Sequence, residues 1–217
     1  MQSANFPPDG LLGLGFTSIS AFHASPVFQT MASAGALPQA VFGFALSSQP
    51  GQSELTIGGT NTALYQVSTI EYVNVSMEAY WQLPLAGLTR PGLNNTPDVV
   101  VVDETSYAQS IIDTGTAMII TSDSNAQAFY ANVTGAAQIG GGLWSGMFIS
   151  CCGIGCVPHF LLVPCDIVGS LAPTLTYGSR NFTVSASTFN LGLVSQGSTN
   201  CIGGIAGGGS GMRLSFS

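Results

Sequence analysis

The residues best suited to chemistry are Asp113-Thr114-Gly115-Thr116, a carboxylate followed by a turn that carries two hydroxyls. Apolar residues flank this segment at Ile111-Ile112 and from Ala117 to Ile120, and both runs predict short buried strands. A carboxylate in such surroundings needs hydrogen-bond partners, because an unpaired buried charge is costly. The threonine hydroxyls can supply them, and Gly115 allows a sharp backbone turn. Asp113 is therefore either a functional carboxylate or the cap of a hairpin turn, and residue types alone leave both interpretations open.

A second candidate site is the group of cysteines Cys151, Cys152 and Cys156, which could be read as a metal cluster. His159 is the one histidine at ordinary ligand spacing, and carboxylates are lacking nearby, so zinc is the less favoured interpretation. We therefore expect no metal and no other cofactor.

The composition excludes several classes of protein. Hydrophobic residues make up 46% of the 217 residues and charged residues only 6%, and no apolar run is long enough to cross a membrane without polar interruption. The chain has three arginines and no lysine, with a formal net charge of −7, which argues against a nucleic-acid partner.

The signals for cellular location are indirect. The segment from Met1 to Asp9 has no basic start and no apolar core, so it does not look like a targeting peptide. Four sequons for N-linked glycosylation favour secretion, at Asn74, Asn94, Asn132 and Asn181.

The elements around Asp113 are predicted to be mostly short strands. A short helix begins at Ser25-Pro26 and ends at Gly35, and another begins at Ser122 or Asp123, with Ala126, Phe129, Tyr130 and Val133 facing inward. The segment 90–98 is predicted to be an exposed loop. Strands are predicted at residues 9–15, 41–46, 53–59, 70–75, 80–88, 99–102, 111–113, 117–120, 160–163, 175–177, 182–184 and 191–194. Short strands at this spacing predict an all-β barrel or sandwich.

The glycine-rich tail from Gly203 to Gly211 is predicted by composition to be flexible, and not to form a core strand.

The sequence resembles the pepsin-like aspartic proteases, in motifs that run in the family's order across most of the chain. The segment Asp9–Gly15 resembles the family's Asp-Gly-Ile-Leu-Gly-Leu segment. Leu55–Gly59 resembles the strand that leads between the two lobes, and Ala79–Gln82 resembles its Tyr-Trp strand. Ile111–Thr116 is similar to the second catalytic Asp-Thr-Gly-Thr loop. Val163-Pro164-Cys165-Asp166 and Cys201 sit where the family's C-terminal-lobe disulfide falls. Five motifs in the right order are a far more specific signal than Asp-Thr-Gly alone.

The resemblance implies a role for each matching residue. Asp113 would be one member of a catalytic pair of aspartates, Thr114 would brace the two catalytic loops, and Gly115 and Thr116 would hydrogen-bond the carboxylate and the substrate backbone. The matches to apolar substrate pockets are Leu11, Tyr80 and Ile111, which could also be ordinary core residues. The disulfide implied for the C-terminal lobe joins Cys165 and Cys201.

The resemblance also implies a fold and its division. The expected fold is all-β, the pepsin-like acid protease fold, with a C-terminal β-barrel lobe with short helices and part of the N-terminal lobe and interlobe sheet. Residues 1–60 would be the tail of the N-terminal lobe and the interlobe strands, and residues 61–217 a C-terminal catalytic lobe that is truncated at its end. The family's first aspartate would lie upstream of Met1. Its apolar-apolar-Gly strand, which threads the second loop, is not evident after Cys201.

The implied function is an aspartic-type endopeptidase that hydrolyses peptide bonds with a water activated between two aspartates. This chain carries only the second aspartate, so we expect it to be inactive alone. The alternative is a non-catalytic pepsin-like protein that binds peptide or protein. Peptide or protein substrates are the expected partners, the full-length form is expected to be a monomer, and the expected location is extracellular, or vacuolar or lysosomal.

Overall fold

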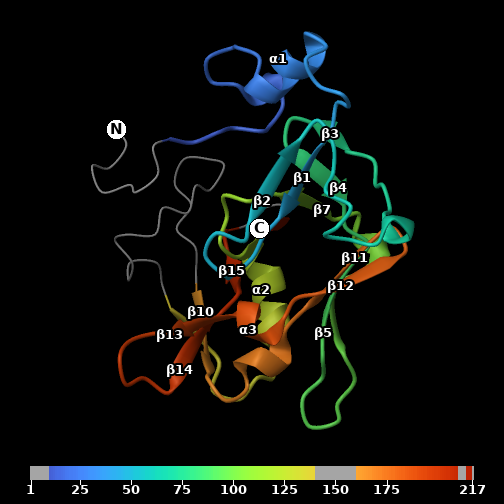
Figure 1. Ribbon diagram of the computed structural model, residues 1–217. Coiled ribbons are helices and arrows are strands. Elements are labelled where there is room, and N and C mark those ends of the chain that lie inside the picture. The colour runs from blue at the N-terminus through green and yellow to red at the C-terminus, as the bar shows by residue number, and fades with distance from the viewer. Residues whose placement is uncertain (1–9, 140–159, 210–213, 217) are drawn as a thin grey trace. The chain divides into compact units, whose positions relative to one another are not determined.

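The computed structural model describes residues 10–139, 160–209 and 214–216 (Figure 1). The chain divides into two compact units. Unit 1 comprises Met1–Tyr72 and Glu78–Tyr80, and unit 2 comprises Val73–Met77 and Trp81–Ser217. The division at residue 60 stays a prediction.

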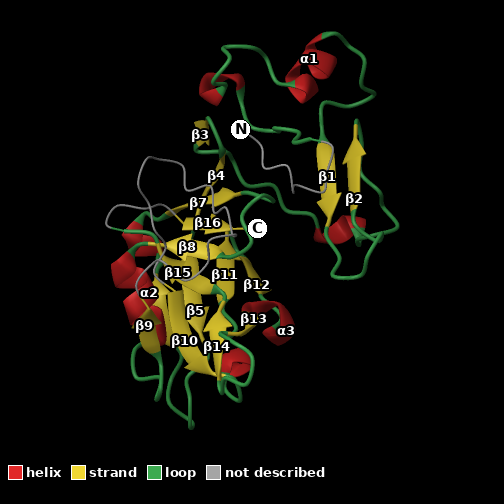
Figure 2. Cartoon of the chain, turned by 90° about the vertical axis from the view of Figure 1, so that its left-hand side faces the viewer, coloured by secondary structure: helices red, strands yellow, loops and turns green. Residues whose placement is uncertain are grey.

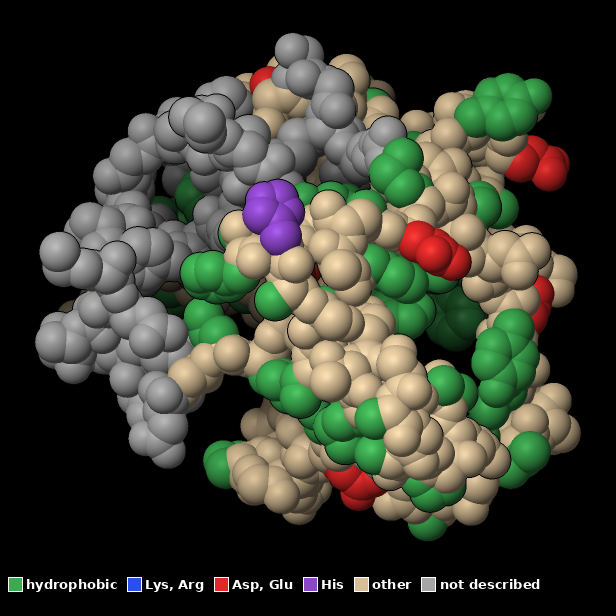
Figure 3. Space-filling view, turned by 90° about the horizontal axis from the view of Figure 1, so that it is seen from above, with side chains coloured by type: hydrophobic (Ala, Val, Ile, Leu, Met, Phe, Trp, Pro, Cys, Tyr) green, Lys and Arg blue, Asp and Glu red, His purple; other side chains and the backbone are tan. Residues whose placement is uncertain are grey.

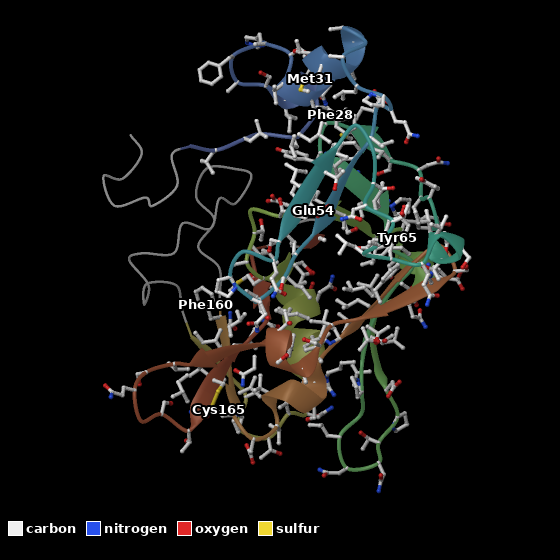
Figure 4. The ribbon with its side chains drawn as sticks, in the orientation of Figure 1. Phe28, Met31, Glu54, Tyr65, Phe160 and Cys165 are labelled. Atoms are coloured by element: carbon white, nitrogen blue, oxygen red, sulfur yellow. A yellow bond between two sulfur atoms is a disulfide. The ribbon has the colours of Figure 1, made fainter. Side chains whose placement is uncertain are left out.

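Unit 1 is built from a short helix and a hairpin. Its elements are η1 (Thr17–Ile19), α1 (Val27–Ser33), β1 (Phe42–Ala45), β2 (Glu54–Ile57) and η2 (Val67–Thr69). Pro26 occupies the N-cap position of α1, and Gly35 follows its end with a φ of 66°, which favours glycine. The buried Phe28 of α1 (Figure 4) packs edge-on against Phe42, with ring centroids 4.8 Å apart.

Unit 2 holds most of the strands. Its first half contains β4 (Trp81–Pro84), β5 (Gly87–Arg90), β6 (Val99–Val102), η3 (Glu104–Ser106), β7 (Gln109–Ile112), β8 (Ile119–Thr121), α2 (Asp123–Tyr130) and β9 (Ala137–Ile139). Its second half contains β10 (Phe160–Pro164), η4 (Val168–Leu171), β11 (Thr174–Tyr177), β12 (Arg180–Thr183), α3 (Ala186–Phe189), β13 (Asn190–Leu193), β14 (Asn200–Gly203), β15 (Ile205–Gly207) and β16 (Leu214–Phe216). The two-residue β3 (Met77–Glu78) straddles the boundary between the units.

The strands of unit 2 form three open sheets, with short helices at their margins (Figure 2). The strand orders are β13-β14-β10-β9, β12-β11-β5-β6 and β15-β8-β16-β7-β4-β3. The prediction of an all-β fold is therefore confirmed, whereas the described strands do not close into the expected barrel. None of the described helices is long and apolar enough to span a membrane.

The core of unit 2 lies against α2. Ala126, Phe129, Tyr130 and Val133 are all buried, as the helical pattern predicted. The helix begins where the sequence indicates, because the side chain of Ser122 accepts a hydrogen bond from the Asn125 backbone N–H at 3.2 Å.

Three strand predictions are wrong. In the segment predicted at 9–15, the described residues 10–15 form no strand. Residues 80–88 are not one strand, because the backbone N–H of Leu85 donates to Ala108 and that of Ala86 to Thr176. The chain thereby passes from β4 in the six-stranded sheet to β5 in a four-stranded sheet. Residues 70–75 form no strand, and the exposed Tyr72 lies in this irregular segment.

The predicted exposed loop at 90–98 is wrong at its first residue. Arg90 ends β5 and is only 3% exposed. Its guanidinium donates to the backbone carbonyls of Phe129, Pro91 and Ala131, and two of these carbonyls belong to the C-terminal end of α2. Burial lowers the pKa of this guanidinium from its usual value. A single buried cation thus caps the helix that carries much of the core.

The glycine-rich tail was wrongly predicted not to form a core strand. Ser210 and Gly211 of this tail lie outside the described residues. Ile205 and Ala206 of β15 are fully buried, and β15 pairs parallel to β8. The glycines are there because neighbours lie too close for a side chain: a methyl group on Gly203 would collide with the Tyr130 hydroxyl, and one on Gly204 would press on Phe189. Composition alone cannot distinguish glycine that confers mobility from glycine that permits close packing.

The final strand corrects the expectation that nothing threads the loop of Asp113. β16 runs parallel to β7 and antiparallel to β8, so that Ser215 lies opposite both Ile111 and Ile120. β16 therefore lies between the two strands that flank Asp113, although its Leu-Ser-Phe sequence lacks the apolar-apolar-Gly pattern.

Replacing Gly203 with alanine should lower the free energy of unfolding by about 2 kcal/mol, because the new methyl group has no room beside Tyr130. Chemical denaturation measures the change. Gly59→Ala is the control, since a methyl group there meets no atom within 4 Å. Equal effects of the two substitutions would contradict the close packing of the tail.

Arg90→Lys should destabilise the fold by about 2 kcal/mol, because one ammonium group cannot reproduce the fork of donors that reaches three carbonyls. The matched control is Arg180→Lys. Arg180 is partly exposed and lies over the Phe182 ring at 5.7 Å, so its replacement should cost less than about 1 kcal/mol. The measurement is again the denaturation midpoint, and a similar shift in both variants would count against the helix-capping role.

Candidate active site

The carboxylate of Asp113 is held by two residues of its own turn, Gly115 and Thr116. The backbone N–H of Gly115 donates to Oδ1 at 2.9 Å, and the hydroxyl of Thr116 donates to Oδ2 at 2.6 Å. The Thr116 N–H also donates to the Asp113 carbonyl at 3.1 Å, which closes the turn. Each carboxylate oxygen therefore has a donor from its own loop, and the side chain is oriented by short local contacts.

The loop is less buried than its apolar flanks indicated. Asp113 is half-buried, Thr114 and Gly115 are exposed, and Thr116 is only 6% exposed. Ile112, predicted to be buried, is 40% exposed. Gly115 sits where a methyl group would press on Oδ1 of Asp113 at 3.2 Å, so glycine here allows the backbone to approach the carboxylate. The carboxylate is accessible and the residue that positions it is buried.

A cluster of uncharged side chains supports the strand that leads into the loop. The Ser76 hydroxyl donates to Oε1 of Gln109 at 2.5 Å, and Nε2 of Gln82 donates to Ser76 at 2.9 Å. Gln82 is 3% exposed, and Gln109 begins β7. The sequence indicates this cluster only through polar residues inside segments that otherwise predict strands.

The predicted substrate-pocket residues fall in different units. Leu11 and Tyr80 belong to unit 1, and Ile111 belongs to unit 2 with Asp113. Leu11 is 79% exposed, whereas Tyr80 and Ile111 are half-buried. Ile111 lies on β7, opposite Gln82 of β4. Ile111 is near Asp113 because it precedes it by two residues in the chain.

The predicted disulfide and the sequons lie away from this loop in the chain. Cys165 and Cys201 form a disulfide, seen as a yellow bond beside Cys165 in Figure 4. The cysteines Cys151, Cys152 and Cys156 lie outside the described residues. Among the residues that are described, no group of three or more His, Cys, Asp or Glu side chains could hold a metal ion.

The sequon asparagines are all exposed: Asn74, Asn94, Asn132 and Asn181. Asn94 and Asn132 have φ values of 52° and 59°, so both lie in turns. The side chain of Asn181, on β12, accepts a hydrogen bond from the Thr176 hydroxyl at 2.8 Å. On the face shown in Figure 3, the acidic side chains are scattered rather than gathered in one patch.

The chemistry available to the loop is that of one accessible carboxylate. Such a group can take a proton from a water or return one to a leaving group. Sharing a single proton between two acids needs a second carboxylate within a few ångströms. The loop by itself supplies one of the two carboxylates that such sharing requires.

Comparison with known proteins points to the same chemistry. A family model described as "Eukaryotic aspartyl protease" matches residues 1–214. The chain is 33% identical over 216 residues to an aspartic protease of Phaffia rhodozyma. The aligned region covers 98% of this chain and 48% of that relative. It is 31% identical over 168 residues to pepsin A of Sus scrofa, covering 77% of this chain and 41% of the relative. It is 27% identical over 205 residues to human (Homo sapiens) cathepsin D, covering 92% and 43%. The chain spans about half the length, or less, of these relatives.

Proposed function

The chain belongs to the eukaryotic aspartyl protease family, and from that premise we propose that it is part of an aspartic endopeptidase in which Asp113 is one of two catalytic aspartates. The observation that carries the proposal is the Asp-Thr-Gly-Thr loop, whose Gly115 N–H and Thr116 hydroxyl hold the Asp113 carboxylate. The longer protein that contains this sequence is called the parent protein below.

In the proposed mechanism the second aspartate comes from a part of the parent protein outside this sequence. The two carboxylates share one proton. The ionised member takes a proton from a water that attacks the scissile carbonyl, and the protonated member donates a hydrogen bond to that carbonyl's oxygen. Thr114 would brace the two catalytic loops. Gly115 and Thr116 keep the Asp113 carboxylate in place, and this chain alone is inactive.

The proposed substrates are peptides and proteins with apolar residues at the cleaved bond, for which Leu11, Tyr80 and Ile111 are the candidate pocket residues. An accessible carboxylate on Asp113 supports a role in contact with substrate. The alternative is a non-catalytic protein that binds peptides, which is favoured by the presence of a single Asp-Thr-Gly in the sequence.

We further propose that the parent protein is secreted, or resides in a vacuole or lysosome, and acts as a monomer without nucleic acid. The disulfide is typical of oxidising compartments, and the four exposed sequon asparagines are candidate glycosylation sites. The net charge of −7 disfavours binding to nucleic acid.

The direct test is cleavage of a protein substrate at acid pH by the full-length parent protein. Asp113→Asn should lower kcat by about 10³-fold or more, because a carboxamide cannot exchange the proton. Glu104→Gln, an exposed acid on η3, is the matched control and should change kcat little. Equal activity of the Asp113→Asn variant and wild type would refute the assigned role. Peptide binding without cleavage by wild type would support the alternative.

The donor on Thr116 can be tested separately. Thr116→Val removes the hydroxyl that holds Oδ2 of Asp113, and kcat of the full-length protein should fall about tenfold or more as the carboxylate loses its orientation. Thr116→Ser keeps a hydroxyl and should retain activity within about threefold. If the valine and serine variants behave alike, the hydrogen bond does not position the carboxylate.

A further inference from the structure

The strand β15 presents a problem that the rest of the sheet does not share. It is the edge strand of the six-stranded sheet in the described part of the chain, yet Ile205 and Ala206 are fully buried. An edge strand has a row of backbone N–H and C=O groups with no neighbouring strand, and buried backbone groups must be paired. Something other than a strand therefore has to satisfy the outer side of β15.

The side of β15 that needs partners can be identified from its pairing with β8. The Ile119 N–H donates to the Gly204 carbonyl at 2.9 Å, so Gly204 faces β8. Successive residues of a strand point their backbone groups in opposite directions, so the N–H and C=O of Ile205 point away from β8. Both are buried on that side.

The Tyr130 hydroxyl pairs with both of these groups. It accepts from the Ile205 N–H at 3.3 Å and donates to the Ile205 carbonyl at 3.2 Å. Tyr130 is 4% exposed, and burial raises the pKa of its phenol above the usual value, so the proton needed for donation is retained. One side chain thus replaces the partner strand at Ile205.

A second contact comes from the other end of the same helix. Oδ1 of Asp123 accepts from the Gly209 N–H at 3.2 Å, two residues beyond β15. Asp123 and Tyr130 are seven residues apart, two turns of helix, so they lie on one face about 10 Å apart along the axis. Ile205 and Gly209 are about 13 Å apart along an extended chain. The spacing on the helix approximately matches the spacing on the segment, and Figure 1 shows α2 beside β15.

The glycines of the segment correspond to the same two side chains. A methyl group on Gly203 would collide with the Tyr130 hydroxyl, and one on Gly207 would collide with Oδ1 of Asp123. Each polar group of the helix thus faces a position where only glycine leaves room. This correspondence is independent of the hydrogen bonds.

We propose that α2 is a clasp: Tyr130 and Asp123 hold β15 against β8 and so act as positioning residues for the loop that carries Asp113. The first pairing after that loop is the Ile119–Gly204 hydrogen bond, three residues beyond Thr116. If β15 is no longer held against β8, the residues that follow the loop lose this pairing and become more mobile. The Thr116 hydroxyl that orients the carboxylate then becomes more mobile with them. The catalytic part of this inference rests on the proposed function, and the clasp itself does not.

The test uses the full-length parent protein with two readouts: amide hydrogen exchange at Ile205 and Gly209, and kcat and KM for peptide cleavage at acid pH. Tyr130→Phe keeps the ring and removes the hydroxyl. The Ile205 amide should then exchange about tenfold faster or more. In the same variant kcat should fall about tenfold, with KM within about twofold of wild type. Tyr107→Phe, at a side chain that is 87% exposed, is the matched control.

Asp123 provides a rescue experiment. Asp123→Ala removes the acceptor and should expose the Gly209 amide and lower kcat, whereas Asp123→Asn keeps an oxygen acceptor and should restore both. Both substitutions remove the charge from the first turn of α2, so the difference between them isolates the hydrogen bond to Gly209. This pair also decides the matter if the Tyr130→Phe variant does not fold.

The outcomes separate the two proposals. Unchanged protection of Ile205 in Tyr130→Phe, or equal behaviour of the alanine and asparagine variants at Asp123, overturns the clasp. Lost protection with unchanged kcat overturns the positioning role. If wild type cleaves nothing, the proposed function fails, and amide exchange alone still decides whether the clasp exists.

Discussion

The structure of unit 2 depends on pairing the backbone of β8 on both sides. β15 lies on one side of β8 and β16 on the other, and both come from the last residues of the chain. Only then do the apolar residues that follow Asp113 become a buried strand, because a strand without partners leaves its backbone groups unsatisfied. The candidate site is therefore held by residues more than eighty positions away in the sequence.

The second constraint is that the backbone passes very close to neighbouring side chains, which only glycine allows. Gly203, Gly204 and Gly207 lie against Tyr130, Phe189 and Asp123, where a side chain has no room. Gly115 plays the same part beside the carboxylate of Asp113. A protein with few charged residues thus relies on packing and on hydrogen bonds from hydroxyls and amides, and its buried Arg90 bonds to carbonyl groups at the end of a helix.

Two properties of the carboxylate loop bear on its chemistry. The carboxylate is oriented by residues close to it in the chain, since Gly115 and Thr116 are within three residues of Asp113. The position of the loop depends on residues far away in the chain, since the flanking strands β7 and β8 are paired with β4, β15 and β16. A site that exchanges protons needs both, because a donor displaced by about 1 Å costs much of the rate. In the proposed function this loop supplies one of two carboxylates, and the sequence contains a single Asp-Thr-Gly.

The sequence by itself determined the all-β class, the capped helix at Ser122 with its buried face, several short strands such as Val99–Val102, and the loop that holds Asp113. These features follow from local periodicity and from residues near in the chain. Only the tertiary structure decided that Arg90 is buried, that residues 80–88 divide between two sheets, and that the glycine-rich tail forms a buried strand. Each of these depends on a distant backbone partner, which a local pattern does not specify.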